Sequence, residues 1–188
     1  DAKIELRPFY LSSNIILNKQ NLNFLIDELV FSILNLKSNL IGNINGDLRL
    51  SLTNVEHELL RNGYINFAIN EKTIKSKEVI FNLGEIGIIE STINYVKNND
   101  EINFISSNIL KIKNKKNFAK KFQIKKTKVE NINQINFKIK KNINTGLISI
   151  SDIEINKLDS LEKNKEKLVN NIKNTQELKT LVKRIIND

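Results

Sequence analysis

The only histidine of the chain, His57, lies between two carboxylates, Glu56 and Glu58. An imidazole beside carboxylates could seed a metal site or form an acid–base pair. Neighbouring residues, however, point in different directions on a helix or a strand, so the three side chains do not converge on one point. The sequence therefore favours a solvated loop or helix-surface residue at position 57 over a catalytic or metal-binding one.

Other motifs that carry chemistry are missing. The 188 residues contain no Cys, no G-x-S-x-G and no phosphate-binding glycine loop. Thiolate sites and the common hydrolase and nucleotide signatures are thereby excluded. The stretch from Gly84 to Gly87 is too short to cradle a phosphate and predicts a bulge or tight bend between strands. We expect no catalytic residue, no metal and no cofactor, in a chain that is not an enzyme.

One segment carries the positive charge of the chain. Residues 113–141 hold eleven Lys and one acid, Glu130, while the whole chain has a net charge of +9. Phe118 and Phe122 lie four apart among these lysines, which predicts a short basic amphipathic helix over 115–124. The lysines that would meet an anionic surface are Lys115, Lys116, Lys120, Lys121, Lys125 and Lys126.

Three interpretations of the segment 113–141 stay open. A/T-rich codons alone would enrich a solvated face in Lys, in a chain that also has 31 Ile and 31 Asn. A basic amphipathic element can instead attract anionic lipid headgroups. Nucleic acid is the least favoured partner, because Arg is scarce and the two Phe have helical spacing rather than that of a stacking platform.

The elements that would position these residues are mainly strands. Large apolar residues alternate with polar ones around 48–52, 65–69, 79–83, 89–96, 102–104, 107–112, 135–139 and 147–155, the period of a strand with one buried face. Asn45-Gly46 and Asn62-Gly63 read as turn dipeptides, and the short spacing between turns predicts an antiparallel meander. Residues 22–40 change to a 3–4 spacing, which predicts an amphipathic helix with Asn21 as its N-cap.

These elements predict a β-rich α+β fold with an antiparallel sheet, an amphipathic helix near the N-terminus and a helical C-terminal tail. We expect a sheet module over 1–157, with the inserted helix at about 22–40, followed by the tail over 158–188. One apolar face of the sheet is expected to hold Leu48, Leu50, Ile65, Phe67, Ile69, Phe81, Ile102, Phe104, Ile135, Phe137 and Ile139. This face is either an ordinary core beneath the two helices or a surface left open for a ligand.

Six segments carry a likeness to a known family: DAKIELRPF at 1–9, NGDLRLSL at 45–52, NGYINF at 62–67, GEIG at 84–87, NFAKKFQI at 117–124 and GLISISDI at 146–153. Together they resemble the C-terminal region of AsmA-like proteins, a bacterial envelope family related to TamB. The resemblance implies a long antiparallel sheet, curled like a taco, whose apolar groove binds or conducts phospholipid. It also implies roles in inter-membrane lipid transport and outer-membrane assembly.

The resemblance further implies a place in the bacterial cell envelope, on the periplasmic side of the inner membrane, with a tether outside this chain. The chain begins at Asp1 and contains no Met, so we expect a processed product or an excised fragment. Phospholipid, the membrane surface and the missing N-terminal part of the same protein are then the expected partners. The main alternative is a self-contained α+β interaction or scaffold domain; a nucleic-acid-binding domain that uses residues 113–141 ranks below it.

Overall fold

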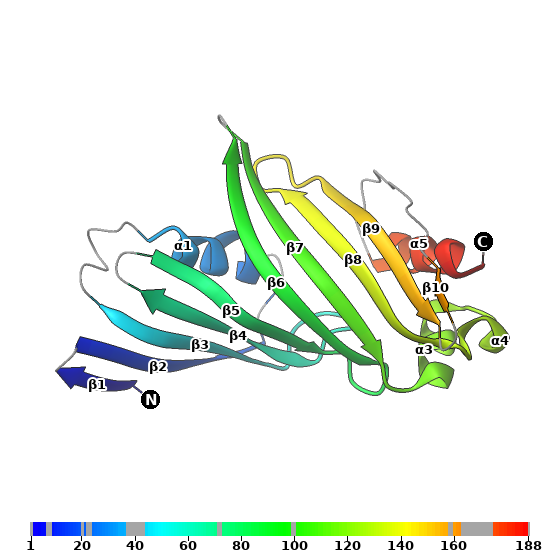
Figure 1. Cartoon of the computed structure of the whole chain (residues 1–188), viewed down its shortest axis with the longest axis horizontal. Coiled ribbons are helices and arrows are strands. Elements are labelled where there is room, and N and C mark those ends of the chain that lie inside the picture. The colour runs from blue at the N-terminus through cyan, green and yellow to red at the C-terminus, as the bar shows by residue number, and fades with distance from the viewer. Residues whose placement is uncertain are drawn as a thin grey trace. The chain divides into compact units, whose positions relative to one another are not determined.

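The computed structural model of the chain consists mainly of strands, ordered in the sheet as they are in the sequence (Figure 1). It describes residues 2–6, 9–19, 21, 24–36, 44–70, 73–98, 101–157, 160–162 and 175–187. The strands are β1 (Ala2–Leu6), β2 (Phe9–Asn18), β3 (Asn45–Thr53), β4 (Asn62–Asn70), β5 (Thr73–Asn82), β6 (Gly87–Asn98), β7 (Glu101–Ile112), β8 (Ile132–Asn142), β9 (Ile148–Lys157) and β10 (Ser160–Glu162). The helices are η1 (Phe24–Val30), α1 (Phe31–Leu34), α3 (Lys115–Phe122), α4 (Lys126–Val129) and α5 (Thr175–Asn187). The predicted β-rich α+β class is confirmed.

The chain divides into two compact units that share strand β6. Unit 1 comprises Asp1–Asn82 and Thr92–Tyr95, and holds β1 to β5 with η1 and α1. Unit 2 comprises Leu83–Ser91 and Val96–Asp188, and holds β7 to β10 with α3, α4 and α5. The segment expected to be a helical tail includes the short strand β10 before helix α5, while residues 163–174 and the predicted N-cap Asn174 lie outside the described part.

Strand pairing within the units is antiparallel with one exception. Strands β2 and β3 are parallel, with Ile15 beside Leu50 and Leu17 beside Leu52. A parallel pair needs a crossover connection, and the helical segment η1–α1 lies within the connection between these two strands. The predicted meander is therefore wrong at this point, because the inserted helix lets the chain return in the same direction.

The inserted helix is less regular than the predicted α-helix over 22–40. It begins as the π-helix η1 and continues as one turn of α-helix that ends at Leu34, and the rest of the predicted range lies partly outside the described residues. The backbone N–H of Leu25 donates to the Asn21 carbonyl at 3.0 Å, so Asn21 lies at the start of the helix. Leu25 and Val30 are both buried and lie five residues apart, a spacing that suits the i→i+5 bonds of a π-helix.

Two predicted turn dipeptides instead lie inside strands. Gly46 belongs to β3, where a Cβ would lie 1.9 Å from the Leu11 carbonyl oxygen of β2. Gly63 belongs to β4, and its Cβ would lie 2.4 Å from the carbonyl oxygen of Ile80. Both glycines therefore permit a close approach of neighbouring backbones rather than a reversal of the chain. The bend predicted at Gly84 is confirmed, with Gly84 at φ 66°.

Candidate functional site

His57 lies in the loop between β3 and β4, as one of the two predicted positions, but it is half-buried rather than fully solvated. Its Nδ1 accepts hydrogen bonds from the backbone N–H groups of Leu59 and Leu60, at 3.2 and 3.3 Å. Burial lowers the pKa of His57 below its usual 6.5, while the Glu58 carboxylate acts in the opposite direction. Among the residues that the structure describes, no group of three or more His, Asp or Glu side chains is placed to hold a metal ion. His57 is thus a residue that organises its own loop.

In unit 1, the pairing of β3, β4 and β5 brings the predicted apolar residues onto one face of the sheet. Leu48 pairs with Phe67, Leu50 with Ile65, and Gly63 with Phe81, and directly paired residues share a face. The exposed fraction is 0% for Leu50, Ile65 and Phe67 and 7% for Ile69, while Leu48 and Phe81 are half-buried. Most of this face is therefore withdrawn from solvent.

The helical segment η1–α1 supplies a cover for unit 1. Its Leu25, Val30 and Ile33 are buried, and α1 packs against β5. The Tyr95 ring meets Phe31 edge to face at 5.2 Å between centroids, and the Tyr95 hydroxyl donates to the carbonyl of Ile26. Burial raises the pKa of Tyr95 well above its usual 10, and the charge of Asp27 adds to this effect. The helix is thereby fixed to the sheet by apolar and polar contacts together.

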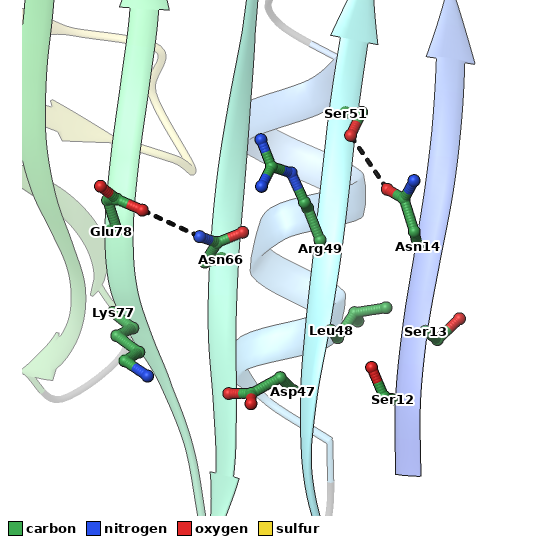
Figure 2. A pocket seen from close by; sticks show the side chains of 10 residues that line it. All are labelled: Ser12, Ser13, Asn14, Asp47, Leu48, Arg49, Ser51, Asn66, Lys77 and Glu78. Carbon is green, nitrogen blue, oxygen red and sulfur yellow. Dashed lines mark hydrogen bonds between the residues drawn. The ribbon is translucent and has the colours of Figure 1, made fainter. Parts of the chain in front are cut away.

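Polar side chains of the opposite face of unit 1, together with the half-buried Leu48, line a trough of about 780 Å³ (Figure 2). Asn66 donates to Glu78 at 3.0 Å, Ser51 donates to Asn14 at 2.9 Å, and the Arg49 guanidinium lies 3.9 Å from the centroid of the Tyr64 ring. The helix η1–α1 lies on the far side of these strands. The trough is lined by charges of both signs, of which Asp47, Arg49 and Glu78 each contact a neighbouring side chain, so its charge favours no single class of ligand.

Unit 2 has an apolar face of its own on β7, β8 and β9. Register places Leu110 beside Ile135, Asn108 beside Phe137, Ser106 beside Ile139 and Phe104 beside Lys141, and alternation adds Ile102. On β9, Ile155 pairs with Ile135 and Ile150 with Ile139. Phe104 and Ile135 are buried, whereas Ile102, Phe137 and Ile139 keep part of their surface exposed. The five predicted lining residues of unit 2 thus share a face, and three of them are accessible.

A buried polar network crosses this face. The Ser91 hydroxyl donates to Asn108 Oδ1 at 2.7 Å, and Asn108 Nδ2 donates to Ser106 Oγ at 3.0 Å and to the Phe137 carbonyl at 3.3 Å. All three polar side chains are buried. Sequence reasoning missed them, although Ser106 and Asn108 occur in phase with Phe104 and Leu110, which marks them as residues of the apolar face.

The predicted basic helix is present as α3, with the Asn114 side chain accepting from the Asn117 N–H at its start. Phe118 and Phe122 pack together at 4.6 Å between ring centroids and are both buried. Of the predicted surface lysines, Lys116, Lys120, Lys125 and Lys126 are exposed, and Lys115 and Lys121 are half-buried. The helix therefore packs its apolar side in the core of unit 2, and its fully exposed residues are the cations Lys116 and Lys120.

No helix among the described residues is both long and apolar enough to cross a membrane. Comparisons with protein-family models, with curated proteins and with solved structures found no match.

Proposed function

We propose that the chain is a non-enzymatic lipid-binding module of the bacterial cell envelope, in which the apolar face of β7, β8 and β9 receives phospholipid acyl chains. The observation that carries the proposal is the shared, partly exposed face formed by Ile102, Phe137 and Ile139. Apolar contacts are non-directional, so an acyl chain can slide along such a face without breaking specific bonds. The resemblance to AsmA-like proteins supports a role on the periplasmic side of the inner membrane, in inter-membrane lipid transport and outer-membrane assembly.

Binding of an acyl chain to an apolar face is favoured by the burial of hydrocarbon. Burial of apolar surface is worth about 0.8 kcal/mol per CH₂ group, so a chain of about 16 carbons gains on the order of 10 kcal/mol before ordering costs. The proposal is limited to unit 2, because in unit 1 the corresponding residues Leu50, Ile65 and Phe67 are fully buried. The proposed acyl-chain site therefore uses only part of the predicted lining of eleven residues.

A photoreactive amino acid at position 139 tests this proposal, with position 140 as its control. Ile139 belongs to the apolar face, whereas Lys140, the next residue of β8, is exposed and alternates to the opposite face. With neutral phosphatidylcholine vesicles, crosslinking to lipid should occur at 139 and be weak at 140. Equal yields at both positions, or none at 139, would reject an acyl-chain site on this face.

A second function, a self-contained interaction or scaffold domain, is favoured by one specific observation. Unit 1 buries its apolar face beneath its own helix η1–α1, as an ordinary core does. The two functions differ in the lipid that copurifies with the chain. Mass spectrometry of the purified protein should detect bound phospholipid under the first proposal and none under the second.

A further inference from the structure

Helix α5 packs against α3 and α4, two helices more than forty residues earlier in the chain (Figure 1). It adds the exposed cations Lys183 and Arg184 to the exposed lysines of α3 and α4. We call this group of three helices, with the connection from Gln123 to Lys125, the basic end of unit 2. Its cations come from two distant segments, so the Lys-rich stretch of the sequence is only part of it.

Positive charges greatly outnumber negative ones in the basic end. Its residues, 115–129 and 175–187, contain nine Lys and Arg184 against a single acid, Glu177. Unit 1 carries nine Lys and Arg against nine Asp and Glu, so the whole net charge of +9 belongs to unit 2. A concentrated positive field of this kind attracts an extended anionic partner.

The apolar sides of the three helices are turned inward. Phe118 and Val129 are 0% exposed, and Phe122, Leu181 and Ile185 are also buried. Among the apolar side chains of these helices whose exposure the structure describes, Val182 is half-buried and the others are buried, so none of them is an exposed residue that could insert between lipid tails or stack on a nucleobase. Recognition at the basic end must rest on charge.

We infer that the basic end docks the protein electrostatically onto an anionic membrane surface, without insertion. Lysine suits this partner, because it is a compact point charge, whereas nucleic acid is typically read by Arg forks and by exposed aromatic rings. Among the described residues of the three helices, Arg184 is the one arginine and both phenylalanines are buried. Docking is distinct from the acyl-chain site proposed on β7 to β9.

Each Lys near an anionic surface contributes roughly fivefold to binding, so removing three should weaken binding on the order of a hundredfold. The test variant is Lys116→Gln, Lys120→Gln and Lys126→Gln combined. Its matched control is Lys19→Gln, Lys75→Gln and Lys140→Gln, three exposed lysines outside the basic end with the same change of charge. Sedimentation with vesicles of phosphatidylcholine containing about 30% phosphatidylglycerol measures the binding, and circular dichroism confirms that both variants fold.

The expected result is a loss confined to the test variant, with binding of the original chain abolished between about 50 mM and about 500 mM NaCl. An equal loss in both variants, or no loss in either, would overturn the inference. Binding that survives the high salt would overturn docking without insertion. Tighter binding to a single-stranded oligonucleotide than to the vesicles at the same salt would assign the basic end to nucleic acid instead. Crosslinking at position 139 uses neutral vesicles, so the two proposals can fail separately.

Discussion

At the scale of single residues, Asn108 shows how a polar group is kept on an apolar face. Its amide is hydrogen-bonded to Ser91, to Ser106 and to the carbonyl of Phe137. A buried amide left unpaired would cost about 1–3 kcal/mol, and these hydrogen bonds offset that cost. The network also interrupts the run of apolar residues between Phe104 and Leu110 on β7 with polar side chains that are themselves buried.

His57 makes stability depend on pH. Its folded-state pKa lies below the unfolded value of about 6.5, because burial disfavours the imidazolium. Above about pH 6.5 both states are neutral; below it the unfolded state binds the proton first, so the free energy of unfolding decreases. The decrease continues until pH falls below the lowered folded pKa. Protonation would also end the acceptor role of Nδ1 toward Leu59 and Leu60.

We predict that His57→Asn flattens this pH dependence, because the amide oxygen can accept a hydrogen bond and does not titrate. Urea unfolding of both proteins, from about pH 8 to about pH 5, measures the difference between their free energies of unfolding. Taking the difference cancels the contribution of the carboxylates. The difference between the two free energies should be constant above about pH 6.5. Below this pH it should shift against the original chain, because only that chain loses stability as His57 binds a proton. Parallel curves over the whole range would contradict the assigned pKa direction.

At the scale of elements, alternation of apolar and polar residues located β3 to β9, since period two reports directly on one buried face. Asn45-Gly46 and Asn62-Gly63 were misleading because the same dipeptide that permits a turn also permits close backbone approach inside a sheet. The parallel pairing of β2 with β3 was not predictable from local pattern. It depends on where the helix η1–α1 packs, which is a long-range property.

Two adjacent residues of η1, one buried and one exposed, can test whether the helix η1–α1 covers the apolar face of unit 1. Leu25 is 1% exposed and Phe24 is 40% exposed. Leu25→Ala should destabilise the protein by about 2–5 kcal/mol through lost burial and a cavity, whereas Phe24→Ala should cost much less. Chemical denaturation followed by circular dichroism measures both. Similar costs for the two variants would show that the helix does not seal unit 1.

At the scale of the whole molecule, sequence and structure differ most in what covers the apolar residues. Alternation predicted that the lining residues share a face, and register places them so within each unit. It could not predict that Leu50, Ile65 and Phe67 are sealed while Phe137 and Ile139 stay partly accessible. Burial depends on packing by helices that are distant in the sequence. The same kind of long-range packing brings the cations of α5 next to those of α3.

If lipid binds only to unit 2, the two units should respond differently to lipid vesicles. Hydrogen exchange with and without neutral phosphatidylcholine vesicles should show slower exchange in β8 and β9 and no change in β3 and β4. The reason is that an acyl chain on the face of Ile139 excludes water and opposes local opening there, while unit 1 has its apolar residues already covered. The variant Ile139→Asp, which places a charge on that face, should abolish the slowing. Protection that appears instead in β3 and β4 would mean that η1–α1 yields to lipid and that unit 1 holds the acyl chain.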